Sequence, residues 1–215
     1  MSAAGSERLP LDVAIIDSGG ANLASLCYAL ERLGARAHVS REPAAIAAAP
    51  RVLLPGVGAA AEAMRRLRAT GLDELIPQLR VPLLGICLGM QLLFEHSAEG
   101  DTGCLGVLPG RIERLAPAPG MPVPHMGWNT LEPLAADPLL TQLPSPAYAY
   151  FVHGYAARVG QTSLAAVQYG RPLAAMVRRA NFWGVQFHPE RSAVTGARVL
   201  RNFLALPVDG CGESR

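Results

Sequence analysis

The sequence of 215 residues contains no lysine, so all 19 of its basic side chains are arginines. This absence excludes enzymes that form a Schiff base through lysine and nucleotide-binding proteins whose phosphate loop ends in Gly-Lys-Ser/Thr. Charge is also scarce, because only 17% of the residues are charged and the net charge is +2. This balance gives no electrostatic footprint for nucleic acid or an anionic membrane, and we expect neither as a partner.

Cysteine is sparse too, and none of the four cysteines stands in CxxC spacing. The spacing argues against a structural zinc site and against a dense disulfide framework, so we expect no metal and a cytoplasmic location. The segment SGGAN at 18–22 is too short for a dinucleotide fingerprint, and we expect no cofactor. The first ten residues hold no apolar core of signal-peptide length, and no apolar run approaches the roughly 20 residues of a membrane span.

Hydrophobic residues, in contrast, make up 50% of the chain, which is enough for a sizeable core. The nearly continuous apolar run at 11–17 predicts a strand that is buried on both faces of a parallel sheet. Residues 21–34 follow with helical spacing, and strand-like and helix-like segments then alternate up to a helix expected over 88–98. The alternation predicts an α/β fold with a doubly wound, mainly parallel sheet flanked by helices.

After about residue 103 the pattern changes, because proline and glycine become dense and short strand-like runs follow one another. These runs predict a smaller antiparallel β region, and residues 198–206 predict a closing helix. No repeat, low-complexity segment or linker divides the chain. We therefore expect one domain over 1–215, with a core at about 11–206 and a tail at 207–215.

The segment Gly85-Ile86-Cys87-Leu88-Gly89 has the spacing of a nucleophile elbow, in which a tight strand-to-helix turn exposes one reactive side chain. Glycine at the flanking positions lets the helix pack closely beneath the turn. Cys87 would lie at a helix N-terminus, which favours the thiolate, and the N–H of Leu88 would face a developing oxyanion. A packed, unreactive cysteine is the alternative interpretation.

A partner for Cys87 is available in the segment GVQFHPERS at 184–192. In an extended chain His188 and Glu190 lie on one face, and Pro189 between them favours that conformation. His188 can accept the thiol proton as a general base, and Glu190 can hold the far imidazole nitrogen. Taken alone, however, this segment favours a surface His-Pro-Glu turn over a catalytic pair.

A third segment, Pro55-Gly56-Val57-Gly58, directly follows the apolar run at 51–54. Such a glycine-rich loop can turn backbone N–H groups toward an anion, although it can equally be a structural turn. This loop, Cys87 and His188 all come directly after predicted strands. In open parallel sheets that edge binds ligands, and the coincidence favours a reactive Cys87 over a packed one.

Together these motifs resemble the class I, or triad, glutamine amidotransferases, which hydrolyse glutamine through a cysteine thioester and pass ammonia to a synthase. The motifs are GICLGMQ at 85–91, PGVGA at 55–59 and FHPE at 187–190. Within that family the chain is similar to the glutaminase subunits of imidazole glycerol phosphate synthases, of histidine biosynthesis. The segments that carry this closer similarity are VPHMGWN at 123–129, YFVHGY at 150–155, FEHSAEG at 94–100 and the start at 17–23.

The resemblance implies roles for individual residues. It implies a catalytic triad of Cys87, His188 and Glu190, with an oxyanion hole at Gly58 and Leu88. The implied glutamine-binding residues are Gly56, Val57, Gln91, His153, Gly154 and Tyr155. The positions that match a partner interface are Asn22, Trp128 and Tyr150.

The implied partner is a (β/α)₈-barrel cyclase subunit in a heterodimer, which uses the ammonia with a ribulosyl formimino aminoimidazole carboxamide ribonucleotide. Its products would be imidazole glycerol phosphate and the aminoimidazole carboxamide ribotide. Because the glycine-rich loop must turn an amide toward the oxyanion, we expect glutamine hydrolysis to be weak until the partner binds. Three residues depart from the family's usual pattern, namely Ser18, Ala21 and Gly154.

Three alternatives remain from the sequence. The chain could be the glutaminase of another triad amidotransferase, such as anthranilate or aminodeoxychorismate synthase, although these lack PHMGWN. It could be a cysteine hydrolase of other amides that needs no partner. It could also be a non-catalytic binding subunit that kept the fold.

Overall fold

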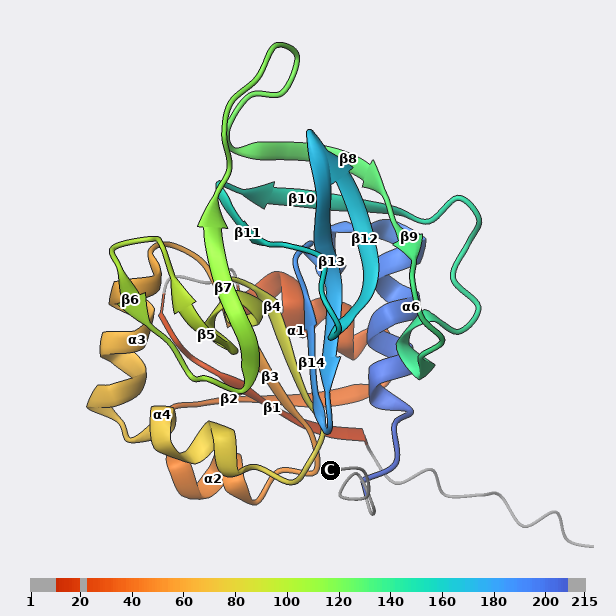
Figure 1. Cartoon of the computed structure of the whole chain (residues 1–215). Helices are drawn as coiled ribbons and strands as arrows, with labels where there is room; N and C mark the ends of the chain where they lie inside the picture. The colour runs from red at the N-terminus through yellow and green to blue at the C-terminus, as the bar shows by residue number, and fades with distance from the viewer. Residues whose placement is uncertain (1–10, 20–22, 209–215) are drawn as a thin grey trace, which may run out of the picture.

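The computed structural model describes residues 11–19 and 23–208. Its largest element is an eight-stranded sheet with the strand order β2-β1-β3-β4-β14-β13-β12-β9 (Figure 1). The first five strands are parallel: β1 (Leu11–Ile16), β2 (Ala35–Ser40), β3 (Val52–Gly56), β4 (Leu83–Cys87) and β14 (Phe182–Val185). The last three are antiparallel: β13 (Arg171–Arg179), β12 (Ser163–Tyr169) and β9 (Glu132–Pro133). The expected parallel sheet is therefore present, and antiparallel strands extend it.

The parallel strands β1, β3, β4 and β14 bury side chains on both faces, which explains their continuous apolar sequences, whereas the edge strand β2 exposes Arg36, His38 and Val39. Along β3, for example, Leu53 packs into one core cluster while Val52 and Leu54 pack into the other. Successive side chains of a strand point to opposite faces, so a strand covered on both sides has to be apolar at every position.

Helices cover the two faces. The longer helices are α1 (Leu23–Glu31), α3 (Ala60–Ala69) and α6 (Ala193–Leu204), and the shorter ones are α2 (Pro43–Ala47), α4 (Leu72–Leu75) and α5 (Leu88–Leu92). Side chains of α1 and α6 belong to one core cluster, and those of α2 to α5 belong to the other. Figure 1 shows α6 on one side of the molecule and α2, α3 and α4 on the opposite side. Three short 3₁₀ helices complete the helical elements: η1 (Ile76–Gln78), η2 (Pro138–Leu140) and η3 (Pro189–Arg191).

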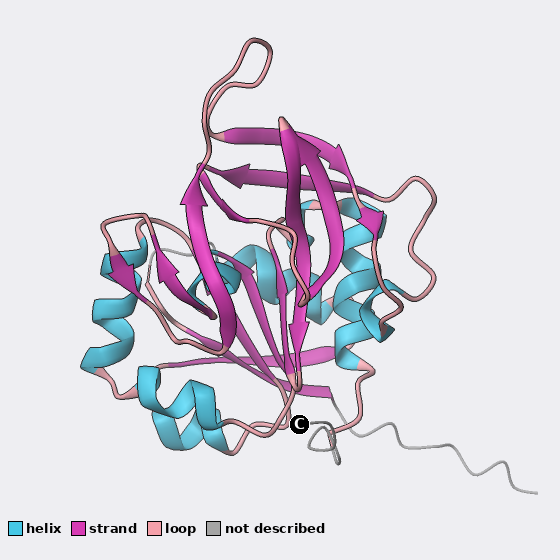
Figure 2. Cartoon of the chain, in the orientation of Figure 1, coloured by secondary structure: helices cyan, strands magenta, loops and turns pink. Residues whose placement is uncertain are grey.

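Two smaller sheets lie beside the main one. Figure 2 shows that strands, in magenta, make up most of the upper part of the view. One sheet pairs β8 (His125–Thr130) with β10 (Tyr148–His153) in antiparallel register. The other has the order β11-β7-β5-β6, with β5 (Phe94–Ser97), β6 (Thr102–Gly103), β7 (Leu108–Arg114) and β11 (Tyr155–Ala157). The antiparallel pairing expected after residue 103 is present between β8 and β10 and between β7 and β11, whereas β5 pairs with β7 in parallel.

The helix that we expected over 88–98 is wrong in its second half. Helix α5 ends at Leu92, and the following residues form strand β5, in which Phe94 pairs with Leu108 of β7. The apolar residues there satisfy either structure locally, and pairing with a distant strand decides between them. Within the described ranges, no helix is both long and apolar enough to cross a membrane.

Candidate active site

Cys87 is the last residue of β4, and α5 begins at the next residue. Its backbone has φ 55° and ψ −112°, a conformation that is costly for a residue with a side chain. Such strain is characteristic of the nucleophile elbow that the sequence predicts. The strand-to-helix turn places the sulfur at the carboxyl edge of the parallel sheet.

The two glycines that flank Cys87 have a steric function. A Cβ on Gly85 would lie 2.7 Å from the carbonyl oxygen of Gly89 and from the nitrogen of Met90. A Cβ on Gly89 would overlap the carbonyl oxygen of Leu54 in β3. Both glycines therefore let α5 pack directly beneath the turn, as we expected from the sequence.

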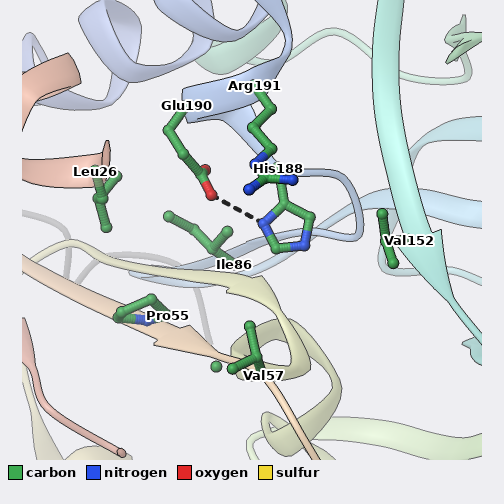
Figure 3. A pocket seen from close by; sticks show the side chains of 9 residues that line it. Leu26, Pro55, Val57, Ile86, Val152, His188, Glu190 and Arg191 are labelled. Carbon is green, nitrogen blue, oxygen red and sulfur yellow. Dashed lines mark hydrogen bonds and ion pairs between the residues drawn. The ribbon is translucent and has the colours of Figure 1, made fainter. Parts of the chain in front are cut away.

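His188 and Glu190 form the second part of the site. Nδ1 of His188 lies 2.9 Å from Oε1 of Glu190, and this interaction is drawn as a dashed line in Figure 3. The route to this geometry differs from our expectation, because Glu190 belongs to the 3₁₀ helix η3 and not to an extended segment. Pro189 is the first residue of η3, where its fixed φ suits a helical start as well as an extended chain.

The environment of His188 determines its protonation. Burial lowers the pKa of this imidazole, but hydrogen bonds to Cys87 and Glu190 and the charges of both groups outweigh burial and raise it to about 10. At neutral pH the imidazole therefore holds a proton. A cationic imidazole beside the sulfur favours the thiolate, which is the nucleophilic form of cysteine.

A cavity opens over Cys87, and it gathers most of the residues that the sequence singled out. It is lined by the proposed nucleophile and base, by both residues of the expected oxyanion hole, and by most of the expected glutamine-binding residues. The residues of this cavity, which we call the substrate cavity, are Val57, Gly58, Cys87, Leu88, Gln91, Glu99, Pro124, Val152, His153, Gly154, Tyr155 and His188. Distant parts of the chain therefore converge on one space.

Inside the substrate cavity the amide of Gln91 is held in a fixed orientation. Its Nε2 donates to the carbonyl oxygen of Tyr155 at 2.8 Å and to Oε1 of Gln186 at 3.0 Å. Both amide hydrogens are thereby used, which leaves Oε1 of Gln91 as an acceptor for a donor on a bound substrate. Nε2 of Gln186 in turn lies 3.9 Å from Sγ of Cys87 and donates toward it.

A second cavity, also lined by His188, is shown in Figure 3. Val57, Val152 and His188 line both cavities, whereas Gly56 lines only the second one. Gly56 is nevertheless adjacent to the nucleophile, because it is in register with Cys87 across β3 and β4.

The loop around Gly58 has a backbone conformation that suits glycine. Gly58 has φ +90°, which favours glycine. Ser18, one of the departures from the family pattern, donates its hydroxyl to the carbonyl oxygen of Pro55 at 2.8 Å and so fastens the loop after β1 to this segment. Gly154, another departure, has only Val123 at 3.8 Å from the place of its missing Cβ.

The expected interface residues lie on the sheet of β8 and β10. Trp128 and Tyr150 are opposite each other in the register, and their rings meet edge to face at 5.8 Å. Trp128 is 55% exposed, and the neighbouring Met126 and Tyr148 are exposed to 63% and 51%. The outer face of this sheet is therefore an exposed apolar surface of the kind that binds other proteins. Asn22 lies outside the described residues.

The inner face of the same sheet carries two buried histidines. Nδ1 of His125 lies 3.1 Å from Nε2 of His153, whose Nδ1 lies 2.9 Å from the carbonyl oxygen of Tyr155. The ring of His125 is stacked between Phe151 and Tyr169. Burial lowers the pKa of each imidazole to about 4, so both rings are neutral near pH 7.

Sequence reasoning assigned no role to three residues that the structure brings to the site. Gln186 and Ser192 are fully buried beside Cys87 and His188, and Glu99 lines the substrate cavity. Gln186 had a signal, since it shares a face with His188 in an extended chain. Ser192 had none, because its partner lies 42 residues away in the sequence.

Comparison with known proteins agrees with this geometry. The family model described as "Glutamine amidotransferase class-I" matches residues 14–206. The chain is 60% identical over 195 residues to "Imidazole glycerol phosphate synthase subunit HisH" of Xanthomonas campestris pv. campestris (strain 8004), which covers 91% of this chain and 98% of the relative. It is 57% identical, with the same coverage, to the protein of that name from Xylella fastidiosa (strain Temecula1 / ATCC 700964).

Solved structures support the fold. A structure described as "Crystal structure of glutamine amidotransferase" has a TM-score of 0.70 at 23% identity, covering 89% of this chain and 96% of that one. The structure of PurLQS from Thermotoga maritima has a TM-score of 0.67 at 19% identity, covering 91% of this chain and 97% of that one.

Proposed function

The chain belongs to the class I glutamine amidotransferases, and from that premise we propose that it is the glutaminase subunit of an imidazole glycerol phosphate synthase. It would hydrolyse L-glutamine to glutamate and ammonia and pass the ammonia to a cyclase subunit. The identity of 57 to 60% to HisH subunits favours this synthase over the chorismate-using alternatives. We propose one amidotransferase domain with its core at about 11–206, and a cytoplasmic location, in keeping with the free thiols of Cys27, Cys87 and Cys104.

The observation that carries the proposal is the His188–Glu190 contact of 2.9 Å at the wall of a cavity that also contains the sulfur of Cys87. In the first step the thiolate of Cys87 attacks the side-chain carbonyl carbon of glutamine. The N–H of Leu88 and an amide of the loop around Gly58 stabilise the resulting oxyanion. His188 gives its proton to the amide nitrogen, the carbon–nitrogen bond breaks, and ammonia leaves a glutamyl thioester behind.

In the second step His188 acts in the reverse direction. The neutral imidazole accepts a proton from water, and the resulting hydroxide attacks the thioester carbon. The second tetrahedral intermediate collapses, the carbon–sulfur bond breaks, and glutamate leaves with the sulfur again as thiolate beside a protonated imidazole. Glu190 holds Nδ1 of His188 through both steps, so that the ring keeps its orientation and its positive charge is balanced.

The name of the relatives as a subunit supports the existence of a partner. We propose that this partner is a (β/α)₈-barrel cyclase and that it docks on the outer face of β8 and β10, around Trp128 and Tyr150. Aromatic side chains on an exposed apolar face are the usual centre of such interfaces. We further propose that docking turns an amide of the loop around Gly58 into the oxyanion hole, so that hydrolysis is weak in the free protein.

The proposal is tested by mixing the chain with the cyclase subunit of the same synthase, glutamine and the formimino ribonucleotide, and by following imidazole glycerol phosphate. Product is expected with the wild type and not with Cys87→Ala. Added ammonium salt should restore product with Cys87→Ala, because the cyclase then needs no glutaminase. Product formation from glutamine by Cys87→Ala at the wild-type rate would contradict the proposal.

A further inference from the structure

We infer that Ser192 is a positioning residue for the catalytic histidine: its hydroxyl fastens the backbone of His188 to strand β10. Through this contact the strand that carries Tyr150 on the proposed docking face also sets the place of the imidazole. The inference rests on the proposed function, because it concerns how a partner regulates the same site.

Three hydrogen bonds form a closed ring between β10 and the histidine. The N–H of His188 donates to the carbonyl oxygen of Tyr150 at 3.0 Å. The N–H of Tyr150 donates to Oγ of Ser192 at 2.9 Å, and this hydroxyl donates to the carbonyl oxygen of His188 at 2.7 Å. Both backbone polar groups of His188 are thus tied to Tyr150, one directly and one through Ser192.

The position of Ser192 in the chain would ordinarily give it another role. It is the N-cap residue of α6, where a serine hydroxyl usually accepts a hydrogen bond from an amide of the first helical turn. Here the side chain makes no such bond. Its relative exposure is 0%, so its hydroxyl has no contact with solvent to satisfy it either. The ring with β10 accounts for both its donor and its acceptor capacity.

Strand β10 touches the triad at a second point. The carbonyl oxygen of Val152 lies 3.7 Å from Sγ of Cys87, two residues after Tyr150. The side chain of Tyr150, in contrast, meets Trp128 on the exposed side of the sheet. A shift of the Tyr150 backbone on docking would therefore move His188 through the ring of hydrogen bonds. The same shift would move the carbonyl oxygen of Val152 relative to the sulfur of Cys87.

The experiment compares wild type, Ser192→Ala, Ser192→Thr and a matched control, each alone and with the cyclase subunit. Ser163→Ala is the control, because Ser163 is also buried and accepts one backbone N–H, that of Gly160 at 3.0 Å, but lines neither cavity. Steady-state kcat and KM for glutamine are measured together with thermal unfolding. Ser192→Cys, which keeps the volume and a weak donor, replaces Ser192→Ala if that variant does not fold.

In the complex, Ser192→Ala should lose about tenfold or more in kcat with KM changed less than about twofold, because a misplaced base slows chemistry but not binding. Its stimulation by the partner should shrink, Ser192→Thr should recover most of the loss, and Ser163→Ala should behave as wild type. A kcat for Ser192→Ala within about twofold of Ser163→Ala, or a rise in KM alone, overturns the inference.

The two proposals fail in different ways. If the wild type with its partner does not hydrolyse glutamine, the proposed function fails. The inference on Ser192 is then decided by the rate at which a glutamine-analogue electrophile labels Cys87. An equal labelling rate in wild type and Ser192→Ala overturns it, and a slower rate in Ser192→Ala that Ser192→Thr restores supports it.

Discussion

Gly89 packs directly against the backbone of Leu54, so that any side chain on Gly89 would overlap the Leu54 carbonyl oxygen. Leu54 lies in β3 and Gly89 in α5, immediately after the nucleophile. The contact therefore fixes the height of the helix beneath the turn and, with it, the position of Cys87. A single steric condition connects the glycine of the sequence motif to the place of Cys87 at the wall of the substrate cavity.

Gly89→Ala should consequently displace the elbow. The added methyl group meets backbone and not a flexible side chain, so we expect destabilisation by about 1 to 3 kcal/mol and a large loss of glutaminase activity. Denaturant unfolding and kcat measure the two effects. Gly103→Ala is the control, because nothing lies within 4 Å of its missing Cβ. Equal stability and activity of the two variants would contradict this explanation of the motif.

Glu190→Gln should change the titration of His188. The carboxylate is one of two groups that raise the pKa of this imidazole to about 10, so its removal should lower that pKa. The loss of an orienting acceptor should also reduce kcat, by about 100-fold or more. NMR titration of ¹⁵N-labelled histidine and steady-state kinetics test both. Glu132→Gln, an exposed carboxylate on β9, should change neither.

The histidine pair His125 and His153 should make stability depend on pH. Their pKa values in the folded chain are about 4, below the ordinary value of 6.5, so the unfolded chain binds protons between these values that the folded chain does not. The contribution of this pair to the free energy of unfolding should therefore be constant above pH 6.5 and should lower the stability as the pH falls from 6.5 toward 4.

His188 does not affect stability between pH 4 and 6.5. Because its pKa is raised from 6.5 to about 10, its stabilising contribution is lost only as the pH rises above 6.5. Denaturant unfolding between pH 4 and 7 should show a smaller decline for His125→Gln than for wild type. His38→Gln, at an exposed site, serves as the control. An identical decline for wild type and His125→Gln would show that the buried pair is not responsible.

Trp128→Ala should weaken the complex with the cyclase. An aromatic side chain at the centre of an interface commonly contributes 2 kcal/mol or more, so we expect about a 30-fold rise in Kd. Leu134→Ala, 50% exposed but outside β8 and β10, should leave Kd unchanged. Isothermal titration calorimetry measures both constants. Comparable Kd values for the two variants would remove Trp128 from the interface.

The fold could be predicted, and Cys87, His188 and Glu190 could be proposed as a triad, because the signals of both are local. A strand buried on both faces is apolar at every position, and the elbow requires glycine at fixed distances from Cys87. The end of α5 could not be predicted, since the run from Leu92 to Phe94 is apolar in a helix and in a strand alike. The pairing of Phe94 with Leu108 decides it.

Contacts between distant segments explain the other differences. Pro189 is compatible with an extended chain and with a 3₁₀ helix, and the packing of η3 against α6 and β10 selects the latter. The sequence likewise carries no signal for the role of Ser192, and only the folded chain brings it to Tyr150.

The central claim is that Cys87 is the one reactive thiol among the cysteines that the structure describes, and that His188 activates it. The most direct measurement is labelling by a glutamine-analogue electrophile in the presence of the partner, followed by mass spectrometry of the peptides. Burial raises the pKa of Cys27, and that of Cys104 to about 11, so neither should react at neutral pH. Among the cysteines that the structure describes, we predict a label on Cys87 alone, and a much slower reaction in His188→Asn; a label on Cys27 or Cys104, or an unchanged rate in His188→Asn, would contradict the account.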